Sequence, residues 1–568
     1  MAQAQCLQGV ARKWAFTQKV SDGGLQISYT FGCSKRLKGV RTMEAAVAEN
    51  YATSPAFAQG GNLDIPAFGG PLGIRWDEGA RVTPWGGLAY FATFLRTSGL
   101  FDRLVADAPF AYTSPNAPDV RNVVGTAVLA TLAGFTRYCH IERLRRDEAC
   151  AALLGLTKIV SDESLRRALK NCDEARLDAW LSRHERESWE PLLRYAYVMD
   201  VDNSVKCIFG RQEGAEVGYN PQRPGRPSHN YHTAFIGTLR IVLTVDVRPG
   251  KMHSGKVGME GVYAMLDALP RELWPRLLRG DVGYGGEGVM ASAEARALAY
   301  LFKVRRSRNV CALFKRLEGS PDWKDCGCGW EAIDTVIRLD GWSRPRRCLL
   351  VRRPAKEKPV EKPAKRPRGR PRKNAVVPVQ QEFEFVECAK GRTWDCYALV
   401  TNDLKLDPVA LTQLYRDRGD CENNFDEYKN QWGWCGFVTQ KLKPTRAMAR
   451  LIAIVANWWN VFCRLAEGGR HMEAITSRPM LMGIVGRIVT SGRKRYMHLT
   501  STHADAPAIR ESLERIGTFL GAISATAPQL GFDRTWALIL RVAFRKWLGG
   551  RPLDPLFDGD QMLLRLSG

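Results

Sequence analysis

The stretch Leu411–Gln431, LTQLYRDRGDCENNFDEYKNQ, decides how the rest of the sequence is interpreted. It contains no proline and one glycine, and it is rich in good helix formers, so it predicts a helix. A phenol, a guanidinium, a carboxylate and an ammonium group occur along it at offsets of 0, 3, 7 and 14 residues, on Tyr415, Arg418, Glu422 and Lys429. At about 100° per residue, these offsets place all four side chains on one face of the predicted helix.

This polar face suits contact with a polyanion and a metal ion. Arginine and lysine bind phosphates, glutamate binds a cation, and tyrosine can contact a phosphate or a base. The alternative is a solvent-exposed helix with ordinary charge pairs three and four residues apart. Only the first interpretation requires further carboxylates and a basic surface elsewhere in the chain.

The composition favours nucleic acid as the partner. The 568 residues include 83 Lys and Arg against 59 Asp and Glu, and the net charge of +24 suits a protein that binds nucleic acid or an anionic membrane. No apolar run approaches the roughly 20 residues that span a bilayer, and the N-terminal sequence lacks the apolar segment of a secretory signal. The 15 cysteines have no framework-like spacing, which suits a reducing cytosol. We therefore expect a cytoplasmic protein that binds nucleic acid and no membrane.

The middle of the chain alternates strands and helices in a way that predicts a mixed α/β sheet. Strands are predicted at 195–201, 206–210, 235–247, 276–285 and 300–306, and helices at 257–269 and 287–298. Asp202 follows the first strand, and Asp281 ends the fourth. The intervening loop 218–232 is rich in Gly and Pro. Its Arg226 and His229 are candidate DNA contacts, with simple packing as the alternative for the histidine.

Residues 307–395 interrupt this rhythm with strand-like segments and are predicted to form a β-rich insertion. Within it, the segment 352–373 carries eleven basic and two acidic residues and predicts a disordered linker. Its Arg368 and Arg370 flank a glycine, as in elements that lie in a narrow A·T minor groove, although non-specific attraction to phosphates is an equal alternative. We expect both arginines to contact DNA.

Helical patterns dominate both sides of this middle part. The N-terminal side has predicted helices at 83–104 and 119–136 and a third that begins after Ser161, which can cap it. The resulting division is an unassigned region (1–82), a helical DNA-binding or end-recognition domain (83–194), the first part of the α/β core (195–306), the insertion (307–395), the part of the core that carries the glutamate helix (396–440), and a helical C-terminal or dimerisation region (441–568).

Three carboxylates have compatible positions for metal-dependent phosphodiester chemistry. Asp202 and Asp281 lie at strand ends of one predicted sheet, and Glu422 lies on a helix that follows its last strand. Such chemistry uses two divalent ions, one for the nucleophile and one for the leaving oxygen. Mg²⁺ or Mn²⁺ is held by few carboxylates together with water and phosphate oxygens, so we expect two ions at one site. Asp200 is an alternative to Asp202 as the first aspartate.

The motifs resemble those of bacterial insertion-sequence DDE transposases of the group 1 branch. Tyr415, Arg418, Glu422 and Lys429 match the signature Y-x2-R-x3-E-x6-K, and the segments around 200–229 and RGDVGYG are also similar. The resemblance implies an RNase H-like catalytic core with Asp202, Asp281 and Glu422 as its metal-binding triad. It implies that Tyr415, Arg418 and Lys429 hold the phosphates of the transposon ends. It further implies a homodimer that binds terminal inverted repeats and target DNA at the nucleoid.

In such enzymes the insertion handles DNA at the transposon end, and an aromatic side chain there can stack on a displaced base. Trp323 is our candidate, with Trp330 and Trp342 as the others and ordinary core packing as the alternative for each. The predicted function is a transposase that cuts and joins DNA by a cut-and-paste route. A DNA-binding regulator without catalysis and a metal-dependent nuclease that does not join DNA are the alternatives.

Overall fold

The computed structural model describes residues 17–21, 24–28, 63–74, 79, 81–112, 114–220, 223–252, 255, 258–355, 386–387, 393–434, 436–526 and 530–553. The chain forms two units, Met1–Gly79 and Ala80–Gly568. The first contains two hairpins, in which β1 (Thr17–Ser21) pairs with β2 (Gly24–Ser28), and β3 (Leu63–Ala67) pairs with β4 (Gly70–Ile74). The second unit contains all the candidate site residues that the structure describes.

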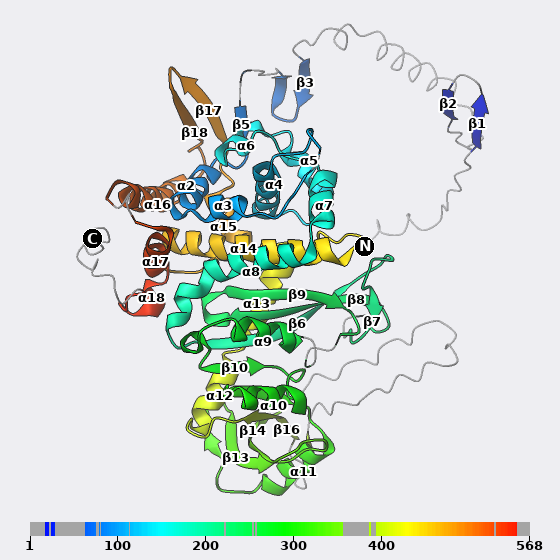
Figure 1. Cartoon of the computed structure of the whole chain (residues 1–568), viewed down its shortest axis with the longest axis vertical. Coiled ribbons are helices and arrows are strands. Elements are labelled where there is room, and N and C mark those ends of the chain that lie inside the picture. The colour runs from blue at the N-terminus through cyan, green and yellow to red at the C-terminus, as the bar shows by residue number, and fades with distance from the viewer. Residues whose placement is uncertain are drawn as a thin grey trace, which may run out of the picture. The chain divides into compact units, whose positions relative to one another are not determined.

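The centre of the second unit is a mixed sheet with the strand order β9-β8-β6-β10-β11 (Figure 1). The strands are β6 (Val198–Cys207), β8 (Pro227–Ile236), β9 (Ile241–Pro249), β10 (Leu277–Gly280) and β11 (Tyr300–Val304). The first three in chain order pair antiparallel, whereas β10 pairs parallel with β6 and β11 parallel with β10. The parallel connections run through α9 (Met259–Asp267) and α10 (Glu287–Ala295), so the predicted mixed α/β sheet is confirmed.

Two strand positions differ from the prediction. The segment 206–210 is not a separate strand, because β6 continues through Cys207. The second strand of the meander is instead β8, which includes the end of the predicted Gly/Pro loop, while the short β7 (Glu216–Val217) pairs with it at the same end. The sequence of β8 is polar for a central strand, but its side chains are buried and Asn230 donates hydrogen bonds to the carbonyls of Gly250 and Met252, at 3.1 and 2.9 Å. Tertiary hydrogen bonds therefore make a strand of a stretch that lacks the usual apolar pattern.

The sheet extends beyond β11 through the residues predicted as the β-rich insertion. Its elements are α11 (Arg308–Leu317), β12 (Lys324–Asp325), β13 (Glu331–Ile337), β14 (Arg346–Pro354), β15 (Val386–Glu387) and β16 (Thr393–Thr401). Strand β16 pairs antiparallel with β11 on one side and with β14 on the other, so one sheet runs through both parts. The predicted strand character of this region is confirmed.

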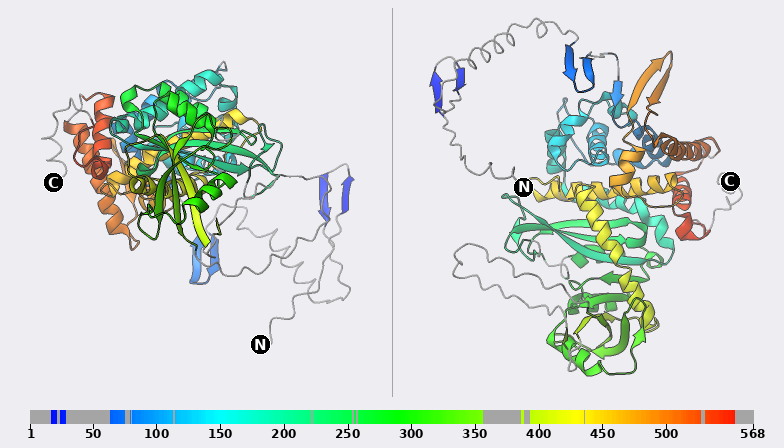
Figure 2. Two further views of the ribbon diagram at one scale, coloured as in Figure 1. Left: turned by 90° about the horizontal axis from the view of Figure 1, so that it is seen from below. Right: turned by 180° about the vertical axis from the view of Figure 1, so that it is seen from behind.

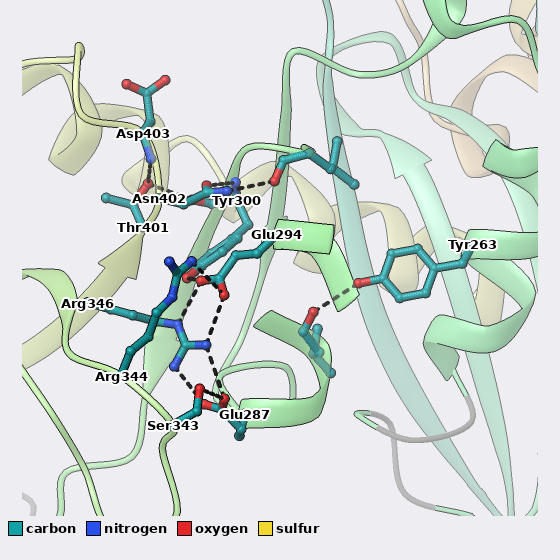
Figure 3. A network of polar contacts seen from close by, with 12 residues as sticks. Tyr263, Glu287, Glu294, Tyr300, Ser343, Arg344, Arg346, Thr401, Asn402 and Asp403 are labelled. Carbon is teal, nitrogen blue, oxygen red and sulfur yellow. Dashed lines mark hydrogen bonds and ion pairs between the residues drawn. The ribbon is translucent and has the colours of Figure 1, made fainter. Parts of the chain in front are cut away.

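A buried arginine fastens this extension to the core (Figure 3). The Arg346 guanidinium bridges two carboxylates of α10, donating to Glu287 at 2.6 Å and to Glu294 at 2.8 Å. The hydrogen bond from Arg346 lowers the pKa of Glu287 to about 2. Because both carboxylates are ionised at neutral pH, the pairs hold the start of β14 against α10.

The first residues of the predicted linker 352–373 belong to a strand, and residues 356–373 lie outside the described residues. Arg352 and Arg353 belong to β14, and Arg352 is buried between Trp323 and Trp394, with its guanidinium carbon 3.8 and 4.3 Å from the ring centroids. It also donates to Glu331 at 2.7 Å. Aromatic faces and a carboxylate compensate the burial of the charge, which composition alone does not show.

Helices from both ends of the chain pack together on one side of the sheet (Figure 1). The N-terminal set is α2 (Leu88–Ser98), α3 (Leu100–Ala106), α4 (Val120–Leu132), α5 (Ile141–Leu144), α6 (Glu148–Leu153), α7 (Asp162–Asn171) and α8 (Glu174–Trp189). The C-terminal set is α14 (Leu442–Ala466), α15 (Ala474–Leu481), α16 (Ala506–Thr526), α17 (Phe532–Ala543) and α18 (Arg545–Leu548). The predicted cap is confirmed, because the Ser161 hydroxyl accepts from the N–H of Ser164 at 3.2 Å. The two helical regions share one hydrophobic core and are not separate bodies.

Helix α14 lies against the edge strand β9. The Asn457 side chain donates to the carbonyl of Val242 at 2.8 Å and accepts from its N–H at 3.0 Å. The amide therefore satisfies backbone groups on an edge of β9 that pairs with no further strand among the described residues. Although α14 is largely apolar, none of the described helices is both long and apolar enough to span a membrane.

The C-terminal region, predicted to be mostly helical, also contains a hairpin. Strands β17 (Gly486–Ser491) and β18 (Lys494–Leu499) pair antiparallel, and β17 also pairs with β5 (Arg81–Thr83). The sequence patterns of this region do not predict the hairpin, although the region is otherwise mostly helical in its described residues, with α15 to α18. The hairpin joins residues that are roughly 400 positions apart into one three-stranded sheet.

Candidate active site

Asp200 and Asp202 project from the same face of β6, because side chains alternate along a strand. Asp200 is fully buried, and Arg279 of β10 donates two hydrogen bonds to its carboxylate at 2.5 and 2.8 Å. Arg279 also donates to the backbone carbonyl of Leu414. Asp200 is therefore held in a buried structural ion pair, which leaves Asp202 as the β6 aspartate that can serve the site.

Asp202 and Asp281 lie near each other because their strands are parallel neighbours. Gly280, at the end of β10, is in register with Val201, so each aspartate follows the paired positions by one residue. The Asp202 carboxylate accepts from the N–H of Asn203 at 2.7 Å, and that of Asp281 accepts from the N–H of Gly283 at 2.8 Å. These backbone donors fix the direction of both carboxylates.

The raised pKa of Asp202 indicates a site that favours a bound cation. Burial raises its pKa to about 6, and the negative charge of Asp281 adds to this, although the nearby Arg418 acts in the opposite direction. The Arg418 guanidinium donates a hydrogen bond to the Asp202 carboxylate. A cation beside Asp202 would stabilise its charged form, which burial and the charge of Asp281 disfavour.

The predicted helix 411–431 is two helices, α12 (Pro408–Arg416) and α13 (Gly419–Asn430). At the junction, the N–H of Arg418 donates to the carbonyl of Tyr415, three residues back, at 3.1 Å. This spacing is that of a 3-10 turn, which is tighter than an α-helical turn. Gly419, a poor helix former, follows it. The prediction of one continuous face is therefore wrong in detail. The break lets Arg418 reach Asp202 while Glu422 and Lys429 face elsewhere.

Tyr415 lies at the end of α12, close to the charged centre. Burial raises its pKa, and its ring lies 5.8 Å from that of Tyr397 of β16. The phenol therefore stays neutral and can donate a hydrogen bond. The charges of Arg418, Asp281 and Asp202 all act on this phenol, so Tyr415 lies near the two aspartates.

Glu422 and Lys429 line a cleft of about 520 Å³ between α13 and the second half of β6. Glu422 is exposed on α13, and Asn203, the neighbour of Asp202, lines the opposite wall. The cleft also contains Lys206, Arg223, Asp426 and the ring of Phe209. Three cationic side chains beside two carboxylates suit a DNA backbone whose phosphates approach a group that can bind a metal ion.

The sequence analysis missed Phe209, whose side chain is 68% exposed at the mouth of this cleft. The guanidinium carbons of Arg223 and Arg226 lie 5.3 and 5.1 Å from its ring centroid. An aromatic ring held between two arginines offers both a stacking surface and positive charge. The signal in the sequence is an aromatic residue placed directly after a strand that carries a candidate aspartate.

The Transposase DDE domain group 1 family matches residues 74–359, just over half of the 568 residues. The chain belongs to this family. The matched range contains Asp202 and Asp281, while Glu422 lies beyond it.

Among solved structures, the chain is similar to the piggyBac transposase in a synaptic complex with hairpin DNA, with a TM-score of 0.34 and 10% identity over 81% of this chain and 86% of that chain. No curated protein matches the sequence.

Transposases of the DDE type typically use divalent metal ions, and the residues fit such an ion in part. Asp202 and Asp281 supply carboxylate oxygens, which are hard ligands for such an ion. The raised pKa of Asp202, caused by burial and by the charge of Asp281, means that a nearby cation would stabilise its ionised form. Glu422 is separate from them: within the described residues, no three His, Cys, Asp or Glu side chains gather closely enough to hold one ion. The Arg418 guanidinium forms an ion pair with the Asp202 carboxylate. The pair of aspartates is therefore assembled, whereas the predicted triad is not.

The other predicted DNA contacts in this DDE-domain protein fare differently. Arg226 is exposed beside Phe209. His229 is fully buried and its ring bonds to the carbonyl of Glu213 at 2.9 Å, so it packs inside the protein and is not presented to DNA. Trp323 is partly buried, with its indole N–H donating to the carbonyl of Leu317 at 2.8 Å. Arg368 and Arg370 lie outside the described residues.

Proposed function

We propose that the chain is an insertion-sequence transposase that binds terminal inverted repeats, cuts the DNA strands at them and joins the ends to target DNA. Membership in the DDE family implies an enzyme that cleaves and transfers phosphodiester bonds. The observation that carries the assignment to this site is that the matched family range includes Asp202, within β6, and Asp281, directly after β10, and that the parallel pairing of these two strands brings the aspartates close together.

The strand order β9-β8-β6-β10-β11, with three antiparallel and then two parallel strands, supports an RNase H-like core. On this proposal β12 to β15 form an insertion between the second aspartate and the glutamate helix. Asp202 and Asp281 would hold Mg²⁺ or Mn²⁺ directly, and Glu422 would complete a second ion site. When bound, such ions activate the attacking hydroxyl and neutralise charge on the leaving oxygen.

The protein's own side chains would position the DNA. Lys206, Arg223 and Lys429 line the cleft with Glu422 and would bind phosphates on either side of the cut. Phe209 would stack on a base next to it. Arg418 would exchange the carboxylate of Asp202 for a DNA phosphate, since a guanidinium binds both groups in the same geometry. A homodimer would bring two transposon ends together.

The second candidate is a DNA-binding regulator without catalysis. The specific observation in its favour is that Arg418 already pairs with Asp202, while Glu422 is separate from both aspartates. Under this alternative the arginine replaces the metal ion permanently. The two proposals predict different results for the same cleavage experiment.

The test is cleavage of DNA that carries the element's own ends, in Mg²⁺ or Mn²⁺, by the wild type, Glu422→Gln and Asp426→Asn. Asp426 is the matched control, because it lies one turn further along α13, lines the same cleft and bonds to Asn430 at 2.6 Å. We expect Glu422→Gln to bind DNA but to lose cutting and joining by at least about 100-fold, the scale of a missing transition-state interaction. Asp426→Asn should retain both activities within severalfold.

Three other results would each change the assignment. Wild type that binds DNA but never cuts it supports the regulator. Cutting without joined products supports a nuclease. Equal activity of Glu422→Gln and wild type removes Glu422 from the site and leaves the proposal without its third carboxylate.

A further inference from the structure

The hairpin β17–β18 projects from the helical side of the molecule (Figures 1 and 2). Ser491 and Lys494 are the last paired residues, so the turn consists of Gly492 and Arg493. Gly492 has a φ of +59°, a conformation that favours glycine in tight hairpin turns. Every side chain from Thr490 to Tyr496 is exposed.

The base of the hairpin is fixed firmly to the helices. The N–H of Gly86 donates to the carbonyl of Ile484 at 2.5 Å. A Cβ atom on Gly86 would lie 2.9 Å from the Cα of Gly486, so the two backbones are in direct contact. Ile488 and Met497 are partly buried near the base. The ribbon is therefore held at one end, and only its tip extends into solvent.

The charge on this ribbon is entirely positive. Residues 486–499 contain Arg487, Arg493, Lys494 and Arg495 and no acidic residue, and none occurs between Pro479 and Ala504. In the described part of the chain, no ion pair includes Arg493, Lys494 or Arg495. Exposed hairpins in a protein normally mix both signs of charge, because like charges on adjacent strands repel. A partner with negative charge would remove this repulsion.

We infer that the hairpin β17–β18 is a second DNA-binding element, which places the side chains of Arg493, Lys494 and Arg495 against the phosphates of double-stranded DNA. A two-stranded ribbon fits the major groove of B-DNA, which is about 12 Å wide. Tyr496, 47% exposed beside the basic residues, adds a ring that can contact sugar or base edges. The inference rests on the proposed function, because it assumes that the protein acts on DNA.

The location separates this element from the cleft that contains Glu422. The helical layer with α14 and α8 lies between the hairpin and the central sheet when the molecule is seen from the front (Figure 1) and from behind (Figure 2, right). Duplex held by the hairpin is thus away from the phosphates that reach the aspartates. The hairpin would contribute to affinity and to the positioning of the transposon end, and the cleft would carry the cut.

The experiment compares the wild type with the combined variant Arg493→Ala, Lys494→Ala and Arg495→Ala. The control variant removes the same charge from exposed positions on α17 and α18, by Arg534→Ala, Arg545→Ala and Lys546→Ala. Affinity for a duplex that carries the element's end is measured by fluorescence anisotropy over a range of salt concentrations. Circular dichroism and melting temperature establish that both variants fold.

We expect the hairpin variant to bind at least tenfold more weakly than wild type at about 0.1 M salt. The slope of log K against log salt should become shallower by up to roughly three, since each lost phosphate contact removes about 0.9. The control should stay within about threefold of wild type in affinity and keep its slope. Equal affinity and slope for the hairpin variant and wild type would overturn the inference.

Measuring DNA binding and DNA cutting on the same proteins separates a failure of the hairpin inference from a failure of the proposed function. If the hairpin variant binds as wild type does, and wild type cuts the DNA, the hairpin has another role and the transposase proposal stands. If the hairpin variant loses binding but wild type never cuts, the hairpin inference stands and the catalytic proposal fails. Loss of binding to vesicles that contain phosphatidylserine, with DNA binding unchanged, would assign the hairpin to a membrane surface and refute the inference.

Discussion

Replacing Asp200 by Asn tests whether its ion pair with Arg279 holds the site together. The Asp200 carboxylate is fully buried, Arg279 is 2% exposed, and the pair also reaches the carbonyl of Leu414 at the end of α12. Removing one member of a buried pair leaves the other charge uncompensated, which costs about 3–5 kcal/mol. We expect Asp200→Asn to lower the melting temperature by about 5 °C or more and to reduce the soluble yield.

Asp202→Asn, two residues along the same strand, is the matched comparison. The rise of its pKa from 3.8 to about 6 means that the ionised form is disfavoured in the folded protein by about 3 kcal/mol. Because the folded pKa lies above the unfolded one, the cost of this group to folding grows as the pH rises above 3.8 and is complete above about 6. At pH 7.5 a neutral Asn removes that cost, while the ion pair between Arg418 and residue 202 is lost. We therefore expect an unchanged or higher melting temperature and a loss of DNA cleavage.

Differential scanning fluorimetry at pH 7.5 and cleavage of the element's ends are measured on the same preparations. The expected pattern is an unstable Asp200→Asn protein and a stable but inactive Asp202→Asn protein. A stable, inactive Asp200→Asn together with an active Asp202→Asn would show that the assignment of the two aspartates is reversed. Equal destabilisation by both changes would show that Asp202 is also structural.

Three further predictions concern the scaffold. Gly87→Ala should destabilise the fold by several kcal/mol, because a Cβ atom there would lie 1.9 Å from the carbonyl oxygen of Leu481. The control is Gly261→Ala, where a Cβ atom would have no heavy atom within 4 Å. Thermal melts should show this control to be neutral or slightly stabilising. Asn457→Ala should cost about 1–3 kcal/mol in urea unfolding, because it leaves buried backbone groups of β9 without partners; a change below 0.5 kcal/mol would contradict that role. Burial acts to raise the pKa of Glu187, but hydrogen bonds from neighbouring histidine and arginine side chains outweigh it and lower the pKa to about 2. Stability from this group is therefore complete above about pH 4.5 and lost as the pH falls towards 2, and Glu187→Gln should flatten that part of a melting-temperature profile.

Much of the fold follows from local patterns in the sequence. The order of strands and helices from β9 to β11, the long apolar α14 and the Ser161 cap were each predictable, because periodicity and capping depend on residues close together in the chain. The nearness of Asp202 and Asp281 follows from the parallel pairing of β6 and β10, but the prediction that Asp202 follows the end of its strand is wrong, because β6 continues through Cys207. The excess of positive charge needs no structure at all.

Tertiary structure decided what depends on distant partners. Asp200 and Asp202 look alike in the sequence, but one meets Arg279, 79 residues away, and the other meets Arg418, 216 residues away. Arg352 is a second example. Composition assigns it to a linker, but its contacts with two tryptophan rings and one carboxylate hold it in β14.

The break between α12 and α13 and the hairpin β17–β18 also depend on long-range contacts. The break lets Arg418 reach β6, and the hairpin pairs with β5 from the other end of the helical region. Sequence alone determined which chemical groups the protein carries and the local elements that hold them. Only the three-dimensional packing determined that Asp200 is buried in an ion pair and that Asp202 is the aspartate available to the candidate site. The free-energy cost of a buried charge depends on its partners, and the chain brings these together only when it folds.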